Sequence, residues 1–182
     1  MKTNLQAFRN DDYRPGAGTV KMVLWYLVNA FLINSWLPFS GMRASLLRLF
    51  GAKIGTGVVF KPYINIKFPW KLEIGNHCWL GEQVWIDNLD QVVIGNHVCI
   101  SQGAMLLCGN HNYQRSTFDL ITGTITLEDG VWIGAKTVVC PGVTCHSHSV
   151  LSVGAVATKN LNAYSVYAGV PAQMLRQRTI QE

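Results

Sequence analysis

The sequence is poor in charge. Asp, Glu, Lys and Arg make up 14% of its 182 residues, against about 25% in a typical soluble domain. Nearly half of the residues are apolar, so we expect much of the surface to be buried against other subunits. The formal net charge is +5, but the basic residues form no run interleaved with aromatics. This pattern argues against a nucleic-acid partner and favours an anionic small molecule.

Two further features are missing. The five cysteines show no Cys-x-x-Cys spacing and are odd in number, which predicts reduced, packed thiols in a cytosolic protein. The polar residues 1–18 lack the hydrophobic stretch of a signal peptide, so we expect a cytoplasmic protein, with association at the inner membrane face as an option.

One apolar run, residues 22–33, is shorter than the ~20 residues that a bilayer span needs. Three interpretations are open for it. It could be a transmembrane helix, a helix that lies on a membrane and makes a peripheral contact, or a helix buried in a cap or an oligomer interface.

What the sequence does contain is a six-residue repeat. Small or aliphatic residues return every six positions from Ile133 through Val139, Cys145 and Leu151 to Ala157. This period fits neither an amphipathic helix nor a hairpin ladder. Three hexapeptides per turn would stack residues that are 18 apart, so that Leu151 lies over Ile133. The repeat therefore predicts a parallel β-helix.

The repeat begins at Ile54 and restarts at Ile74 and at Ile94, each time after 20 residues, which predicts coils with a bulged corner. We expect an N-terminal arm and apolar helices over 1–50, the second helix running from 41 or 42 to 50. The β-helix should cover 51–168, and a tail or short helix 169–182. The repeat fails over 110–120, and a loop that leaves a rigid solenoid commonly carries function.

Several motifs resemble those of the hexapeptide-repeat O-acetyltransferases, which include galactoside and maltose enzymes. The apolar N-terminus and two further motifs are similar to the acetyltransferases of colanic acid biosynthesis. The motifs are Gly109-Asn110-His111, Val131-Trp132-Ile133-Gly134-Ala135, Pro141-Gly142-Val143, Thr158-Lys159 and Ala168-Gly169-Val170-Pro171-Ala172, with Trp85-Ile86-Asp87-Asn88 and Cys99-Ile100-Ser101-Gln102-Gly103 for the colanic acid group.

The resemblance implies an all-β solenoid, a left-handed parallel β-helix. It further implies a homotrimer with active sites in the clefts between neighbouring prisms. The expected activity is transfer of an acetyl group from acetyl-CoA to a saccharide hydroxyl in surface polysaccharide biosynthesis, and the acceptor could be lipid-linked. No metal is expected.

The resemblance also assigns roles to residues. His111 matches the family's catalytic histidine, and an imidazole can take the hydroxyl proton near neutral pH. Asp87 and Asn88 end a block one coil before the excursion. They could bind sugar hydroxyls or form an Asx turn at a corner.

For the donor, Trp132 is similar to the tryptophan that lines the family's cleft. Ala135 stands where galactoside enzymes have a serine near the thioester, and its backbone N–H could polarise the carbonyl. Thr158, Lys159 and Arg176 match positions along the pantetheine and phosphate end of coenzyme A. Ordinary packing and solvated charge are the alternative explanations.

Two other functions compete with this one. A metal-dependent enzyme of the carbonic-anhydrase type would need histidines close to His111, and a non-catalytic β-helix scaffold would need no site at all. The cluster from Cys145 to His148 is a poor tetrahedral ligand set. His77 and His97 occupy equivalent places in successive coils, so we expect them to form a structural column.

Overall fold

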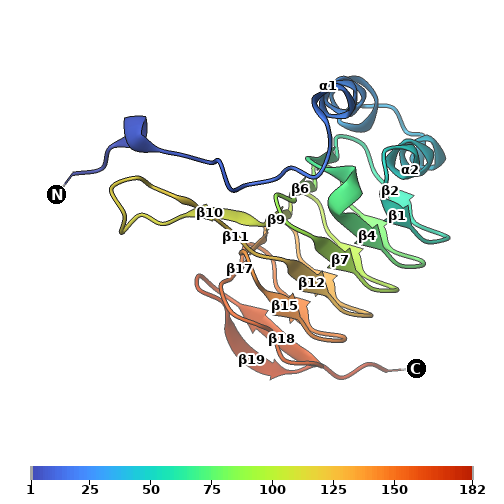
Figure 1. Ribbon diagram of the computed structural model, residues 1–182. Coiled ribbons are helices and arrows are strands. Elements are labelled where there is room, and N and C mark those ends of the chain that lie inside the picture. The colour runs from blue at the N-terminus through green and yellow to red at the C-terminus, as the bar shows by residue number, and fades with distance from the viewer. Residues whose placement is uncertain (1, 182) are drawn as a thin grey trace.

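The computed structural model describes residues 2–181 and shows a parallel β-solenoid with a helical segment at its N-terminal end (Figure 1). The chain passes through three sheets, named here I, II and III, and returns to sheet I after each coil. Sheet I contains β1 (Lys53–Ile54), β4 (Leu72–Ile74), β7 (Val92–Ile94), β12 (Ile125–Leu127) and β15 (Thr144–Cys145). Sheet II contains β2 (Val59–Phe60), β5 (Trp79–Leu80), β8 (Cys99–Ile100), β13 (Trp132–Ile133), β16 (Val150–Leu151), β18 (Ser165–Ala168) and β19 (Gln173–Gln177). Sheet III contains β3 (Asn65–Ile66), β6 (Trp85–Asp87), β9 (Met105–Leu107), β14 (Val138–Val139) and β17 (Val156–Ala157).

The predicted stacking of the repeat is confirmed. Ile133 pairs in parallel with Leu151, and Ile74 pairs with Ile94 across the bulged restart. These side chains point into the prism and are almost completely buried. Burial of one such aliphatic side chain stabilises a fold by roughly 1.5–3 kcal/mol, so the inward columns are the main source of stability.

The corner between sheets I and II is also built from repeated residues. His77 and His97 both have a positive φ, near 55°, and their rings stack with centroids 5.2 Å apart, as predicted. Beside them the backbone N–H of Asn76 donates to Oδ1 of Asn96 at 2.9 Å, and the N–H of Asn96 donates to Oδ1 of Asp129 at 2.7 Å. This ladder satisfies corner N–H groups that the sheets leave free.

The N-terminal helices cap the first coil (Figure 1). They are α1 (Thr19–Val28), the π-helical turn η2 (Asn29–Ile33) and α2 (Ser40–Leu49), with short 3₁₀ turns at η1 (Leu5–Ala7) and η3 (Pro69–Lys71). Trp25 and Ile33 are fully buried, and the buried Arg43 donates to the carbonyls of Ile33 and Ser35. Within residues 2–181 the structure contains no helix with the length and apolar character needed to cross a membrane.

The C-terminal segment differs from the predicted short helix or tail. Residues 173–177 form β19, which pairs antiparallel with β18. The chain reverses at Gly169, whose φ of +93° suits a residue without Cβ. The edge of sheet II then supplies backbone partners, which explains why a strand forms where the sequence alone indicated a helix or tail.

Candidate active site

The predicted excursion from the solenoid is a β-hairpin. Its strands, β10 (Gly109–His111) and β11 (Leu120–Thr122), pair antiparallel, with His111 opposite Leu120. It leaves the prism where the chain passes from β9 in sheet III to β12 in sheet I, a corner named here the III–I edge. Gly109 opens the hairpin against the side chain of Leu89, which a Cβ at this position would meet.

The imidazole of His111 is held by a single residue of the hairpin. Its Nδ1 lies 2.8 Å from the carbonyl oxygen of Phe118, and the two rings stack with centroids 4.4 Å apart and an interplanar angle of 11°. A carbonyl oxygen can only accept, so Nδ1 carries the proton in this contact. The neutral ring therefore presents the lone pair of Nε2, which is the atom that a general base uses.

The residue that orients His111 has an unusual backbone. Phe118 has a φ of 54°, a region that a bulky residue rarely adopts. Such conformations cost of order 1–3 kcal/mol and persist where the surroundings enforce them. Here the consequence is that the Phe118 carbonyl and ring both face His111.

The N-terminal arm lies along the hairpin (Figure 1). The N–H of Asn4 donates to the Ser116 carbonyl at 2.8 Å, and Phe8 contacts the His111 ring edge-on with centroids 5.9 Å apart. Farther along, the Tyr13 hydroxyl donates to the Leu89 carbonyl at 2.8 Å. The sequence predicts an N-terminal arm here but gives no sign of its contact with the hairpin.

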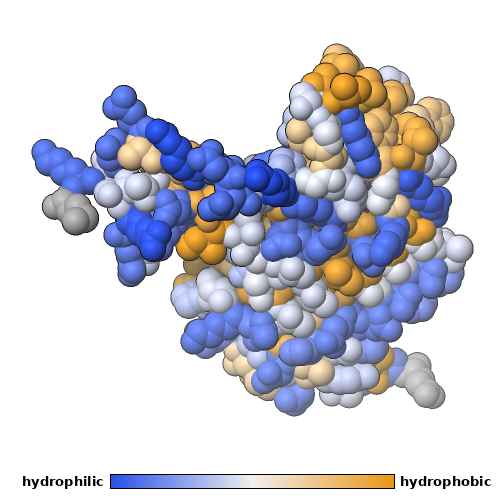
Figure 2. Space-filling model, in the orientation of Figure 1, coloured by the Kyte–Doolittle hydropathy of each residue, from blue (hydrophilic) through white to orange (hydrophobic). Residues whose placement is uncertain are grey.

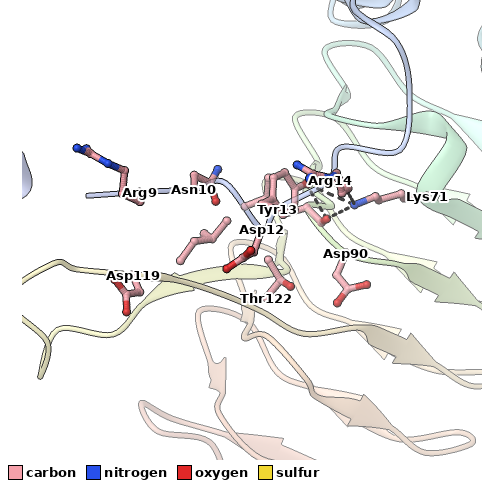
Figure 3. A pocket seen from close by; sticks show the side chains of 11 residues that line it. Arg9, Asn10, Asp12, Tyr13, Arg14, Lys71, Asp90, Asp119 and Thr122 are labelled. Atoms are coloured by element: carbon pink, nitrogen blue, oxygen red, sulfur yellow. Dashed lines mark hydrogen bonds between the residues drawn. The ribbon is translucent and has the colours of Figure 1, made fainter. Parts of the chain in front are cut away.

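Between the arm and the prism lies a cavity of about 590 Å³, which is shown in Figure 3. Leu120, the cross-strand partner of His111, forms part of its wall. The lining residues are Arg9, Asn10, Asp12, Tyr13, Arg14, Lys71, Leu89, Asp90, Asp119, Leu120 and Thr122.

Two polar residues fasten the arm across this cavity. The Lys71 ammonium donates to the Arg14 carbonyl at 3.2 Å and lies 3.4 Å from the Tyr13 hydroxyl. Burial lowers the pKa of Lys71, whereas burial, followed by the charge of Asp87, raises the pKa of Tyr13 to about 12. Sequence reasoning missed both residues, because neither belongs to a repeat or a motif.

The structure separates the roles of Asp87 and Asn88. Asp87 is half-buried and its carboxylate lies 2.8 Å from the Lys67 ammonium. Asn88 is fully buried: its amide donates to the Phe68 carbonyl and accepts from the Phe68 N–H. Asn88 therefore has a corner role in this chain, which was the alternative left open for it, because its amide is already paired with the backbone.

Trp132 and Ala135 share a groove of about 480 Å³ on another side of the prism. Its residues lie in strands of sheet II or directly after them, where the chain turns toward sheet III, and this corner is named here the II–III edge. The indole N–H of Trp132 donates to Ser101 Oγ at 3.0 Å, and the ring is about half exposed. Among residues 2–181 no hydrogen-bond acceptor takes the N–H of Ala135, so this group is available to a ligand.

The remaining predicted donor residues lie elsewhere. Thr158 and Lys159 follow β17 in sheet III and are exposed on the III–I edge, the edge that carries the hairpin. Arg176 is exposed on β19, opposite Val166 of β18. One chain thus places His111, Thr158 and Lys159 on one edge, and Trp132 and Ala135 on another.

No group of three or more His, Cys, Asp or Glu side chains within residues 2–181 is arranged to hold a metal ion. In the cluster from Cys145 to His148, His146 is instead hydrogen-bonded to a carboxylate, and its Nδ1 lies 2.9 Å from Glu128 Oε1. Glu128 also accepts hydrogen bonds from Ser147, and the bonds from His146 and Ser147 lower the pKa of its carboxyl.

Comparison with known proteins identifies the family. No family model matches the chain. The chain is 37% identical to WcaF of Escherichia coli (strain K12), a protein provisionally assigned as a colanic acid biosynthesis acetyltransferase, over 92% of each chain. The chain belongs to the hexapeptide-repeat acetyltransferases.

Other members of this acetyltransferase family are also similar. The galactoside O-acetyltransferase of E. coli (strain K12) is 29% identical over 74% of this chain and 68% of that enzyme. A hexapeptide-repeat acetyltransferase of Vibrio cholerae O1 biovar eltor, solved in complex with acetyl coenzyme A, has the same fold. Its TM-score is 0.83 at 23% identity, covering 96% of this chain and 97% of that chain. The predicted resemblance is confirmed.

Proposed function

We propose that this acetyltransferase moves an acetyl group from acetyl-CoA to a hydroxyl group of a saccharide, with His111 as the general base. The observation that carries the proposal is the fixed imidazole: Nδ1 is bound by the Phe118 carbonyl, which leaves Nε2 free to accept a proton. The names of WcaF and of the galactoside enzyme support a saccharide acceptor. WcaF further supports a role in surface polysaccharide biosynthesis.

The reaction needs one base and one stabilised oxyanion. His111 Nε2 takes the proton of the acceptor hydroxyl while its oxygen bonds to the thioester carbonyl carbon. The carbonyl electron pair moves to oxygen, where a backbone N–H can stabilise the charge. The carbon–sulfur bond then breaks, and the proton on Nε2 passes to sulfur, which gives the acetyl ester and the coenzyme A thiol.

For the donor we propose the groove that contains Trp132 and Ala135. Its free Ala135 N–H suits the developing oxyanion, and the exposed Trp132 ring offers an apolar wall to the pantetheine. Thr158, Lys159 and Arg176 are exposed and so accessible to the rest of coenzyme A, and the two cations complement its phosphates. The acetyl-CoA complex of the V. cholerae relative supports this donor.

We further propose that the active protein is a homotrimer. His111 and the Trp132 groove lie on different edges of one prism, so a single chain does not bring the base to the proposed thioester site. A neighbouring prism that packs its II–III edge against the III–I edge of the first would do so. Three such contacts close a ring.

For the acceptor we propose the cavity beneath the N-terminal arm. Its wall includes Leu120, which is the cross-strand partner of His111. The wall also contains both carboxylates and cations, such as Asp90 and Lys71. Such groups suit a polyhydroxylated ligand, because hydroxyls both donate and accept. Asp87, which raises the pKa of Tyr13 at this wall, keeps its proposed contact with the sugar.

The test is acetyl transfer by the purified full-length protein, followed as release of the coenzyme A thiol with a panel of saccharide acceptors. We expect His111→Ala to lower kcat by about 10²–10⁴-fold without weakening coenzyme A binding. His77→Asn, on the corner between sheets I and II, is the matched control and should remain active. Near wild-type turnover of His111→Ala would rule out His111 as the base.

A further inference from the structure

The outer face of the first helix is apolar, although it faces solvent. Val20, Val23, Leu24, Leu27 and Phe31 are between 51% and 75% exposed. Their spacing of three and four residues places them on one stripe of α1 and η2. The water-facing side of a surface helix is normally polar. An apolar stripe on that side is therefore unusual for a helix that packs only against the solenoid of its own chain.

The stripe cannot be buried by a rotation of the helix. The opposite face is pinned to the prism by Trp25 and Ile33, which are fully buried. The Trp25 indole N–H donates to the Ile66 carbonyl at 3.0 Å, and the Asn29 amide donates to Asn65 Oδ1 at 2.8 Å. Whatever covers the outer stripe must therefore come from outside this chain.

Two aromatic residues enlarge the stripe into a surface. Trp36 and Phe39, in the link between η2 and α2, are more than half exposed. Figure 2 shows the hydrophobic colour gathered over the α1 and α2 end of the molecule, beside the hydrophilic arm. We call this the cap surface; its residues are Val20, Val23, Leu24, Leu27, Phe31, Trp36 and Phe39.

The chain segment that carries the cap surface has charge of one sign. Residues 13–72 contain eight Lys and Arg side chains and no Asp or Glu, although the chain has ten acidic residues in all. Lys21 and Lys61 are exposed in this segment. Lys53 and Lys67, by contrast, are paired with Glu73 and Asp87, which lie beyond this segment. Such one-sided charge indicates an anionic partner.

We propose that the cap surface is a docking site for a lipid bilayer that contains anionic lipids. An apolar helical stripe with flanking cations lies in the interface plane of a membrane, with its apolar side chains below the headgroups. Tryptophan and tyrosine favour the same depth, as Trp36 and the exposed Tyr26 of α1 allow. A groove on a protein partner could also bind the apolar stripe. Such a partner would not by itself explain why residues 13–72 contain no acidic residue.

This docking goes beyond acetyl transfer, and it sets the orientation of the enzyme. The cap surface lies at the N-terminal end of the solenoid, and the β18–β19 hairpin lies at the other end (Figure 1). A bound prism therefore stands with its coils pointing away from the bilayer. In the proposed trimer of parallel prisms, three cap surfaces would face one plane, and their binding would be multivalent.

The proposal is tested by co-sedimentation of the full chain with two sets of vesicles, phosphatidylcholine alone and phosphatidylcholine with phosphatidylglycerol. We expect binding to the anionic vesicles that weakens as salt is raised. Replacing Lys21 and Lys61 together by Gln should weaken it by about 25-fold, since each cation near the surface contributes about fivefold. Lys136→Gln, outside residues 13–72, is the matched control.

The apolar contribution is tested with Leu24→Gln, Leu27→Gln and Phe31→Gln combined. These side chains are exposed, and Gln is a good helix former, so the fold should survive. Vesicle binding should fall at least tenfold, while Leu175→Gln on β19 should leave it unchanged; Phe31→Gln alone should show a smaller loss if the triple variant folds poorly.

Three results would overturn the proposal. They are no binding of the wild-type chain to anionic vesicles, equal binding to both vesicle types, and a lower oligomer mass for the triple variant, which would make the cap surface a contact between copies. None of these readouts involves acetyl transfer, so their failure is distinct from failure of the proposed function.

Discussion

The carbonyl oxygen of Phe118 lies 2.8 Å from Nδ1 of His111, and the Phe118 ring lies almost parallel to the imidazole at 4.4 Å. One residue thus determines both the tautomer and the plane of the proposed base. It does so from a left-handed backbone conformation, with φ 54°, which costs stability.

The first prediction concerns this orientation. Phe118→Ala keeps the carbonyl but removes the stacked ring, so the imidazole should sample other planes. We expect kcat to fall about tenfold, because small misplacements of a catalytic group lower the rate strongly, while KM for acetyl-CoA stays the same. Tyr113→Ala, exposed in the same hairpin, is the control. An equal change in kcat for both variants would show that the ring has no positioning role.

The proposed sharing of each active site between two chains predicts complementation between two inactive variants. His111→Ala removes the base, and Ala135→Trp should fill the groove on the II–III edge. If each site uses the base of one chain and the groove of the next, an equal mixture refolded together should recover about one quarter of wild-type activity.

The control for this experiment mixes His111→Ala with the double variant. No chain in this mixture carries the base, so no activity should return. Failure of the first mixture to recover activity, with mixed oligomers demonstrated by mass, would mean that each site takes its base and its groove from the same chain, and it would contradict the proposed trimer site.

Buried thiols predict a loss of stability in alkali. Burial raises the pKa of Cys108 and Cys145 from 9.0 to about 12. Their contribution is complete below pH 9 and is lost as pH rises toward 12, because the unfolded chain releases these protons first. Each thiol should lower the free energy of unfolding by up to about 1.4 kcal/mol per pH unit in this range.

Urea unfolding from about pH 8 to about pH 10 measures this slope. Cys145→Ala should reduce it. Val139→Ala, which also makes a hole among fully buried residues, should lower stability by about 2 kcal/mol at every pH and leave the slope unchanged. Parallel curves for the wild type and Cys145→Ala would contradict the assignment.

Close stacking of the coils predicts opposite effects for two glycines. A Cβ at Gly75 would lie 2.6 Å from the Gly95 carbonyl oxygen and 2.8 Å from Asn96 Oδ1, so Gly75→Ala should cost about 1–3 kcal/mol. Gly41, in α2, has open space around it, and Gly41→Ala should stabilise by about 0.4–1 kcal/mol. Thermal unfolding of both variants tests the pair, and a neutral Gly75→Ala would show that the coils can separate.

The periodic part of the fold was predictable because its signal is local. Ile133 and Leu151 are 18 residues apart, which is three units of the six-residue repeat. Their pairing can therefore be predicted from the repeat alone, without knowledge of any distant contact. The restarts at Ile74 and Ile94 were readable for the same reason. His111 was assigned through its match to the family's catalytic histidine, and the interruption of the repeat only located the segment that contains it.

The remainder depended on contacts that leave no periodic trace. Phe8 and His111 are 103 positions apart in the sequence but their rings are in contact. No pattern in the polar arm predicts this contact. Asn88 looked available until the structure showed its amide paired with Phe68. β19 forms because the edge of sheet II is unpaired, which is a property of the finished coil and not of residues 173–177.

The return of the chain after β18 also closes the end of the solenoid. Gly169 and Ala172 exchange backbone hydrogen bonds with Val156 of β17, Leu161 bridges to Cys145 of β15, and β19 covers β18. Each sheet therefore ends against a segment that does not continue the spiral. An open last coil would be a template on which further molecules could stack into fibres; in this chain β19 and the segment 161–172 occupy that position instead.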